Sequence, residues 1–371
     1  MSQLSTEDRV LLSQSLDAFL RDTWSYETLR HTLKGTEGRR ADWWLRFAQE
    51  LGLLGLAQPE TVGGMGGEAA DLAIIAEGLG RHLVNEPFLQ SVVVAGELLR
   101  DVGEVADAAL SSLIAGETII APALFERGSR YQAEAVETTA TEDGQGWVLN
   151  GRKSVVRAAP WANGFLVSAR VTQGISLFLV EAEAAGLSLI SYATFDGQRA
   201  ADVVLDGVVV SQDAQIGATG AGLERIERAL DVGALIQAAE AVGVMGHLLE
   251  TTLGYVRQRR QFGQPIGTFQ SLQHRLADMA MALKRADAVT RASLASLQAP
   301  APVRARAVSA AKLAVNAACE MIGEGAVQLH GAIGLTEELS VSHAFKRVTA
   351  IQTELGDAAY HQERLAFTKA A

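Results

Sequence analysis

Two short stretches of the sequence carry residue types suited to holding an anion. The first covers residues 257–262, where three arginines precede Phe262 and a glycine. Guanidinium groups bind phosphate and carboxylate in a fixed fork geometry. The second covers residues 328–334, whose glycines let the backbone approach an anion closely. Each stretch also has a structural interpretation: the arginines suit a solvated helix face with Phe262 in the core, and a glycine turn simply ends a helix.

The composition limits the kind of protein to which these stretches belong. The chain has 371 residues, 48% hydrophobic and 20% charged, which suits a folded globule with two or three domains. The net charge of −11 argues against a nucleic-acid-binding surface, so an anionic ligand must be held by local donors. The only cysteine, Cys319, excludes an internal disulfide. We expect it to be a packed core thiol rather than a catalytic one, and we expect no metal centre.

The N-terminal residues do not predict export or membrane insertion. Residues 1–20 are amphipathic and include Glu7, Asp8 and Asp17, whereas a secretory signal needs a basic start and a continuous apolar stretch. No uncharged run reaches the roughly 18 residues that a membrane span requires. We therefore expect a cytoplasmic protein that binds neither membrane nor nucleic acid.

Hydrophobic periodicity predicts helices over residues 1–120. Ser5 and Asp8 form a potential capping box ahead of an apolar helical run, and the glycine-rich residues 61–71 must be a loop. Over residues 121–220, short runs of Val, Ile, Leu and Phe separated by Gly, Asn and Asp indicate strands. Asn150-Gly151 predicts a tight turn between two of them. No βαβ alternation and no glycine-rich dinucleotide loop is present, which argues against a Rossmann fold.

Residues 221–371 return to a helical pattern. Long helical patterns cover residues 222–261, 268–297 and 305–331, and the proline-containing residues 299–303 interrupt them. A last helix begins near Asp357, which suits its N-cap.

Together these patterns predict a mainly α fold with a central β domain. We expect an N-terminal helical domain over residues 1–120, an antiparallel β-barrel or sandwich domain over 121–220, and a C-terminal four-helix bundle over 221–371. Bundles bury ligands between facing helices.

Three stretches of the chain resemble the acyl-CoA dehydrogenase family. Residues 51–81 resemble its N-terminal helix–loop–helix. Residues 257–283 contain an Arg-x-x-Phe-Gly element followed by Phe-Gln and Ala-Asp-Met, and residues 327–348 resemble its Gln-x-x-Gly-Gly-x-Gly turn and the next helix. The likeness covers nearly the whole chain. Within the family, the chain is most similar to the small-subunit type of pimeloyl-CoA dehydrogenases.

The resemblance implies a flavin-dependent reaction on an acyl-CoA thioester. In the family, a carboxylate removes a proton from Cα, and Cβ transfers a hydride to N5 of FAD. Electrons then leave through an electron-transfer flavoprotein. Because the family's FAD is contacted from two subunits, we expect a homodimer or tetramer, or a heterotetramer with a second acyl-CoA dehydrogenase subunit.

The resemblance also assigns residues to FAD and CoA. The residues that match FAD contacts made across a subunit interface are Arg259, Gln261 and Phe262. Those that match contacts to FAD phosphates are Gln328, Gly331 and Gly334, whereas His330 is expected to be structural. Asp231 matches an aspartate near the pantetheine arm of CoA, although the arginine that usually follows three residues later is Ala234. A solvated position on a helix surface is the alternative for Asp231.

The chain departs from the family pattern near the flavin ring. Residues 125–130 replace a Thr-Glu-Pro and Gly-Ser-Asp element, in which Ser129 remains a candidate FAD contact. Residues 155–157, Val-Val-Arg, replace a Trp-Ile-Thr that lies against the flavin. Arg157 either supplies a positive group near a flavin or carboxylate or is a surface arginine. Ala332 replaces a glycine of the phosphate turn.

The catalytic base of the family is missing from both positions where members carry it. The commoner position, directly before Gly356, is Leu355, and the alternative position is Gly233. Glu354 is adjacent and is our candidate catalytic base, because a loop path shifted by one residue brings it into the pocket. An exposed loop carboxylate is the alternative for Glu354.

Three functions therefore remain open. The first is an FAD-dependent acyl-CoA dehydrogenase that introduces an α,β double bond. The second is a non-catalytic subunit that shares an FAD site with a catalytic partner, which the absent base favours. The third is another flavin chemistry on the same scaffold, such as that of an oxidase or monooxygenase.

Overall fold

The computed structural model describes residues 4–368, and the chain divides into two compact units. The sheet unit contains Thr32–Asp71 and Asn85–Gly233. The helical unit contains Ser5–His31, Leu72–Val84 and the chain from Ala234 onward. Each unit therefore gathers segments that are separated in the sequence.

The N-terminal third is helical, as predicted. Its helices are α1 (Thr6–Thr23), α2 (Tyr26–Lys34), α3 (Ala41–Leu51), α4 (Ala69–Arg81), α5 (Gly96–Leu99) and α6 (Glu104–Ile114), with a π-helical segment, Phe88–Ala95, before α5. The capping box of α1 is confirmed, because the Ser5 hydroxyl accepts the Asp8 amide at 3.1 Å and the Ser5 amide donates to the Asp8 carboxylate at 3.0 Å. The glycine-rich loop lies between α3 and α4, but residues 69–71, which were predicted to belong to it, already form the start of α4.

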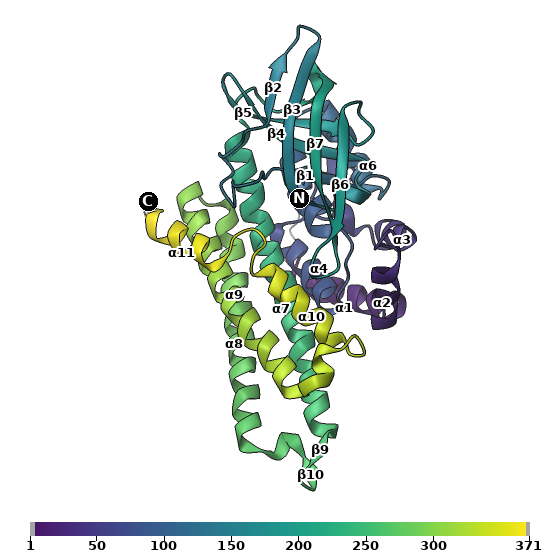
Figure 1. The fold of residues 1–371 in the computed structure, drawn as a ribbon, viewed down its shortest axis with the longest axis vertical. Coiled ribbons are helices and arrows are strands. Elements are labelled where there is room, and N and C mark those ends of the chain that lie inside the picture. Colours follow the sequence, from purple (N-terminus) through teal and green to yellow (C-terminus); the bar gives the residue numbers. More distant parts are fainter. Residues whose placement is uncertain (1–3, 369–371) are drawn as a thin grey trace. The chain divides into compact units, whose positions relative to one another are not determined.

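The sheet unit is built on one eight-stranded sheet within residues 4–368. Its strands are β1 (Ile120–Ala123), β2 (Thr139–Glu142), β3 (Gly146–Arg157), β4 (Gly164–Val171), β5 (Gly174–Glu181), β6 (Leu187–Ala193), β7 (Arg199–Ser211) and β8 (Gln215–Ile216). The order is β6-β7-β3-β2-β4-β5-β8, with β1 pairing β4 (Figure 1). Trp147 of β3 and Phe178 of β5 meet in its buried core, with ring centroids 5.3 Å apart.

The expectation of a purely antiparallel sheet needs correction. Two pairings are parallel, β1 with β4 and β2 with β4, so the sheet is mixed. The strand order is an open path rather than a closed ring. The parallel pairings arise because the chain returns to β4 after long connections, which local strand signals do not reveal.

The predicted turn at Asn150-Gly151 is wrong. Both residues lie inside β3, at a register shift between Leu149 and Gly151. Gly151 has φ +151°, and a Cβ there would lie 2.5 Å from Thr138 Oγ1. The Asn150 side chain accepts the Gly207 amide at 2.8 Å. The dipeptide therefore makes a β-bulge against neighbouring strands instead of reversing the chain.

The remaining chain is helical, with one small hairpin. Its elements are α7 (Gly222–Gln258), β9 (Arg260–Gln261), β10 (Gln264–Pro265), α8 (Gln270–Leu294), α9 (Ala301–His330), α10 (Ser340–Ile351) and α11 (Ala358–Phe367). In the helical unit, α8 and α9 lie side by side (Figure 1). The predicted break is confirmed only at residues 299–300, because α9 already begins at Ala301 and includes Pro302 in its first turn. The N-cap of α11 is confirmed, since the Asp357 carboxylate accepts the Tyr360 amide at 2.8 Å.

Two glycines bring α4 and α7 into backbone contact inside the helical unit. A Cβ at Gly80 would lie 2.2 Å from the Glu240 carbonyl oxygen, and a Cβ at Gly243 would lie 2.0 Å from the Glu77 carbonyl oxygen. Side chains separate most packed helices by roughly 8–10 Å, so only glycine permits this approach. The contact fixes the turn of α7 from which the Glu240 side chain projects.

By length and composition, α7 is the one helix of residues 4–368 that is long and apolar enough to cross a membrane. Its most apolar 18-residue window has a hydropathy of 1.5 and is 83% buried within the protein. The buried core helix of a globular protein also meets this criterion of length and composition.

Candidate active site

A strained hairpin follows the end of α7. The Arg259 amide donates to the Tyr255 carbonyl at 2.8 Å, and the chain then turns between β9 and β10 at Phe262 and Gly263. Phe262 has φ +51°, which is uncommon for a bulky residue, and its side chain is 89% exposed. The structural alternative of a core position for Phe262 is therefore wrong, because the turn presents its ring to the outside. Its predicted contact with FAD stays a prediction.

A ring stack holds the ends of α7 and α9 together. The Tyr255 and His330 ring centroids are 4.4 Å apart, and the Tyr255 hydroxyl donates to the His330 carbonyl at 3.3 Å. Arg259 follows Tyr255 by four residues, and Gly331 follows His330 directly. The two stretches predicted to hold an anion therefore lie at the same end of the helical unit.

This end of the helical unit offers donors to an outside ligand. Arg259, Gln261 and Gln328 are exposed, and within residues 4–368 the Arg259 guanidinium has no recorded hydrogen bond or ion pair. Gly331 has φ +67°, and a Cβ there would meet nothing within 4 Å, so its backbone is open. A free guanidinium, two amides and an open glycine backbone fit the pyrophosphate and adenosine of FAD.

Gly334 and His330 have structural explanations at the same turn. Gly334 is buried, and a Cβ there would lie 2.9 Å from the Cβ of His330. His330 is itself buried, and its Nδ1 lies 2.8 Å from the Ala326 carbonyl oxygen. The structural role expected of His330 is confirmed, and close packing alone explains the glycine at 334.

In the sheet unit, Ser129 is engaged within its own loop. Its hydroxyl accepts the Glu126 amide at 3.0 Å and donates to the Glu126 carbonyl at 2.9 Å. The Glu126 carboxylate accepts Lys153 Nζ at 2.6 Å and the amides of Glu137 and Thr138 at 2.8 and 3.0 Å. Burial lowers the pKa of Lys153 to about 8 although Glu126 opposes the shift. This ion pair anchors the 125–130 loop to β3.

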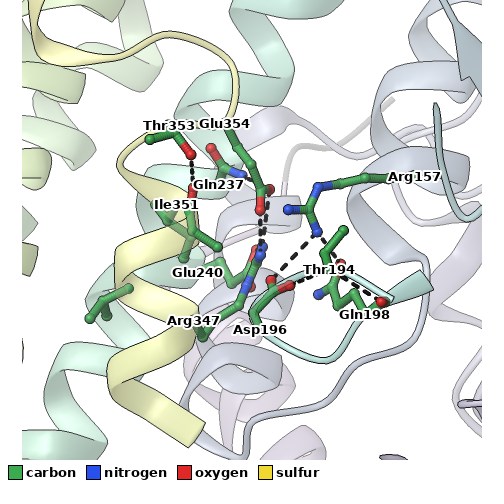
Figure 2. A network of polar contacts seen from close by, with 12 residues as sticks. Arg157, Thr194, Asp196, Gln198, Gln237, Glu240, Arg347, Ile351, Thr353 and Glu354 are labelled. Atoms are coloured by element: carbon green, nitrogen blue, oxygen red, sulfur yellow. Dashed lines mark hydrogen bonds and ion pairs between the residues drawn. The ribbon is translucent and has the colours of Figure 1, made fainter. Parts of the chain in front are cut away.

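Arg157 is not a surface residue. Its guanidinium donates to the Gln198 side chain at 2.9 Å and lies 3.5 Å from the Asp196 carboxylate, which is fully buried (Figure 2). The Thr194 hydroxyl donates to the same carboxylate at 2.5 Å. Arg157 therefore lies in a half-buried polar cluster of the sheet unit, and the surface interpretation is wrong.

Asp231 is also buried rather than solvated. It lies on α7 and is 2% exposed. The alternative of a solvated helix surface is therefore wrong for this residue. Its match to the CoA-binding aspartate stays a prediction.

The turn before α11 is closely packed around Leu355 and Gly356. Leu355 has φ +52°, and its carbonyl accepts His361 Nε2–H at 3.0 Å. A Cβ at Gly356 would lie 2.2 Å from His361 Nε2, so glycine is required there. Burial lowers the pKa of His361 to about 3, which keeps its imidazole neutral, with Nδ1 accepting the Ser309 hydroxyl at 3.2 Å. The turn therefore carries an apolar side chain at residue 355, where the resemblance predicts the base.

Glu354 is bound on both carboxylate oxygens. Figure 2 shows its side chain directed at Arg347, whose Nη1 lies 2.7 Å from Oε1, while the Gln237 side-chain amide donates to Oε2 at 2.5 Å. Arg347 also holds Glu240 in a bidentate pair at 2.6 and 3.0 Å. The Glu354 side chain is only 10% exposed, so the alternative of an exposed loop carboxylate is wrong.

Lys312 completes this buried network. We call the four residues Glu240, Lys312, Arg347 and Glu354 the bundle quartet. The Lys312 Nζ donates to the Gln237 side chain at 3.1 Å and to the carbonyls of Ile351 and Glu354 at 2.9 Å each. Burial lowers the pKa of Lys312 to about 8. The quartet contains two cations and two carboxylates, so it is balanced in charge. A proton accepted by Glu354 would disrupt its ion pair with Arg347.

Other chemistry-bearing groups offer little. Cys319 is fully buried, and burial raises the pKa of its thiol to about 12, which confirms a core thiol. Among residues 4–368, no group of three or more His, Cys, Asp or Glu side chains is placed to hold a metal ion.

Comparison with known proteins adds three matches to one family. The acyl-CoA dehydrogenase N-terminal domain matches residues 6–117, the middle domain matches 121–208, and the C-terminal domain matches 220–367.

Individual relatives agree with the family match. The human mitochondrial short-chain specific acyl-CoA dehydrogenase is 30% identical over 81% of this chain and 76% of the relative. The Caffeyl-CoA reductase-Etf complex subunit CarC of Acetobacterium woodii is 29% identical over 80% and 81%. The ChsE4–ChsE5 complex of Mycobacterium tuberculosis contains a chain with a TM-score of 0.89 and 27% identity, and the match covers 100% of both chains.

Proposed function

Because the chain belongs to the acyl-CoA dehydrogenase family of FAD-dependent oxidoreductases, we propose that it takes part in α,β-dehydrogenation of an acyl-CoA thioester. The observation that supports FAD binding is the open end of the helical unit, where Arg259, Gln261 and Gln328 are exposed beside the open Gly331 backbone. Bound FAD supplies the hydride acceptor for Cβ of the substrate. The pimeloyl-CoA subtype stays a prediction.

In this proposal the residues at the bundle end bind and orient the cofactor. The Arg259 guanidinium pairs with the pyrophosphate, the amides of Gln261 and Gln328 add hydrogen bonds, and the Phe262 ring covers apolar cofactor surface. We expect a second subunit to complete the site, because Phe262 is 89% exposed in the single chain. The Arg259→Gln substitution should weaken FAD binding, whereas Arg275→Gln, which alters an exposed arginine on α8, should not.

A second candidate function is favoured by the bundle quartet. Leu355 occupies the family's base position, and Arg347 and Gln237 already bind both oxygens of Glu354. In this version the chain is the non-catalytic subunit of a heteromeric acyl-CoA dehydrogenase, and its partner supplies the carboxylate that removes the Cα proton. The relative in the ChsE4–ChsE5 complex is likewise part of a complex of two differently named proteins.

The visible absorption spectrum of the chain purified alone tests both versions. The spectrum should be recorded before and after anaerobic addition of saturated acyl-CoAs. It should also be recorded after the bound flavin has been chemically reduced and α,β-unsaturated acyl-CoAs have been added, since one relative is named a reductase subunit. Flavin bands bleached by a thioester would establish a self-sufficient dehydrogenase. Bound flavin that no thioester reduces, but that is reduced once a second subunit is added, would establish the heteromeric version.

Two further outcomes bear on the acceptor and the chemistry. We expect electrons to pass to an electron-transfer flavoprotein, as the name of the Etf-complex relative suggests, rather than to oxygen. Rapid oxygen consumption with an acyl-CoA would instead favour the oxidase alternative. A chain that binds no FAD, alone or in an assembly, would contradict the proposal.

A further inference from the structure

One tyrosine of α7 contacts both stretches that offer donors to FAD. The Tyr255 carbonyl accepts the Arg259 amide at 2.8 Å, one helical turn before the hairpin. The Tyr255 hydroxyl donates to the His330 carbonyl at 3.3 Å, and this carbonyl belongs to the peptide bond that joins His330 to Gly331. All four residues lie in the helical unit, so their placement relative to one another is defined.

The His330 side chain packs between Tyr255 and its own helix. The two rings are stacked, with centroids 4.4 Å apart and planes inclined by 28°. The His330 Nδ1–H donates to the Ala326 carbonyl at 2.8 Å, and a Cβ at Gly334 would lie 2.9 Å from the His330 Cβ. The stack therefore joins the end of α7 to a closely packed part of α9.

The backbones of both donor stretches are held, whereas their donors are open. The Arg259 carbonyl accepts the Ile266 amide at 2.8 Å, and the Gly331 amide donates to the Val327 carbonyl. Within residues 4–368 the Arg259 guanidinium has no recorded hydrogen bond or ion pair, and a Cβ at Gly331 would meet nothing within 4 Å. A ligand that contacts both therefore depends on the separation of the two helix ends that the stack bridges.

We propose that Tyr255 is a positioning residue for the phosphate-binding part of the FAD site. Through its ring stack with His330, it holds Arg259 and the Gly331 backbone at a separation that suits one pyrophosphate. The inference rests on the FAD binding proposed above. A long arginine and a glycine turn lose conformational freedom when they bind one ligand, and a fixed separation of their backbones lowers this cost. Tyr255 itself offers FAD no donor in this role, because its hydroxyl is bound to the His330 carbonyl.

A double-mutant cycle between positions 255 and 259 tests the proposal. FAD affinity is measured by titrating deflavinated protein, in the assembly that binds FAD. Arg259→Gln should weaken binding about 10–100-fold, the factor that corresponds to one charge-assisted hydrogen bond. Tyr255→Leu, which removes the ring and the hydroxyl, should weaken binding about tenfold. In the Arg259→Gln background, Tyr255→Leu should cost less than about threefold, because the guanidinium that it positions is already gone.

Matched variants separate positioning from general stability. Tyr255→Phe keeps the ring stack and loses only the hydroxyl bond at 3.3 Å, so it should bind FAD within about threefold of the wild type. Val315→Ala alters a fully buried residue of α9, roughly 22 Å along the helix from His330, and should lower the Tm without changing FAD affinity. If Tyr255→Leu does not fold, His330→Leu removes the other ring of the stack and should show the same reduced cost in the Arg259→Gln background.

Defined results would overturn the inference. Equal losses of FAD affinity in both backgrounds would show that Tyr255 does not act through Arg259. Unchanged affinity in Tyr255→Leu, or a Phe variant as weak as the Leu variant, would remove the role of the ring stack. An equal loss in Val315→Ala would reduce the effect to general stability. A wild-type protein without FAD would contradict the proposed function as well, whereas FAD-binding Tyr255 variants that match the wild type would contradict only this inference.

Discussion

The Glu354→Gln substitution distinguishes a structural carboxylate from a catalytic base. The change keeps the size of the side chain and a hydrogen-bond acceptor for Arg347, but it removes the negative charge. Arg347 retains its bidentate pair with Glu240 at 2.6 and 3.0 Å, so only one of its two ion pairs is lost. Because Glu354 is 10% exposed, solvent screens this pair poorly.

The size of the effect follows from these contacts. A hydrogen bond to a charged group contributes about 1.5–3 kcal/mol. We therefore expect the free energy of unfolding to fall by about 2 kcal/mol and the Tm by roughly 2–3 °C for a chain of 371 residues. If Glu354 is structural, turnover of the intact enzyme should change by less than about threefold. Loss of a general base would instead lower turnover by about 10²–10⁴-fold.

Thermal melts and acyl-CoA-dependent dye reduction measure the two quantities on the same preparation. Glu320→Gln is the matched control, because Glu320 is exposed on α9 and has no recorded side-chain partner within residues 4–368. An unchanged Tm together with a hundredfold loss of turnover would refute the structural interpretation and identify Glu354 as the base.

Three further predictions concern neighbouring features. Leu355→Glu should raise thioester-dependent flavin reduction by the chain alone about 10²–10⁴-fold in stopped-flow experiments; no gain, with FAD bound, would show that the turn is not a base position. Val155→Gly should raise the free energy of unfolding, measured in urea, by about 0.5–1 kcal/mol. Glycine removes the strain of a valine with φ +54°, and this gain exceeds the larger conformational entropy that glycine loses on folding. A lower urea midpoint of unfolding would contradict this prediction. Burial lowers the pKa of His361 to about 3 in the folded protein, whereas in the unfolded chain its imidazole is protonated below about pH 6.5. The free energy of unfolding should therefore fall by about 1.4 kcal/mol for each unit by which the pH is lowered from 6.5 to 3. His361→Gln should flatten that slope in urea titrations, whereas the exposed His274→Gln should not.

Features encoded by nearby residues were predicted correctly from the sequence. The Ser5–Asp8 capping box and the Asp357 N-cap each depend on residues three positions apart, so the local pattern contains the whole interaction. The helix–sheet–helix order likewise follows from hydrophobic period and turn residues. The turn at Asn150-Gly151 failed because pairing with neighbouring strands overrode a strong local signal.

Features that depend on distant partners were not predictable in this way. Lys312 lies 75 residues from Gln237, and Arg347 lies 107 residues from Glu240, so no local pattern reveals the bundle quartet. A lone lysine inside the apolar run of α9 was the available signal, because a buried lysine requires acceptors. The partner of Arg157 was equally hidden from a local pattern, because Asp196 lies 39 residues away in the connection between β6 and β7.

The contact between α4 and α7 restricts how this protein can change by mutation. Gly80 of α4 faces a carbonyl of α7, and Gly243 of α7 faces a carbonyl of α4. Each helix therefore carries one glycine that the close approach of the two backbones requires. An alanine at either position forces the helices apart, and no second substitution at the other position restores the lost space. A variant with a wider crossing must therefore displace the turn that carries Glu240, and with it the partner of Arg347. Substitutions on the exposed faces of these helices leave this contact intact. A larger distance between α4 and α7, by contrast, requires single-substitution variants that are less stable than the present protein.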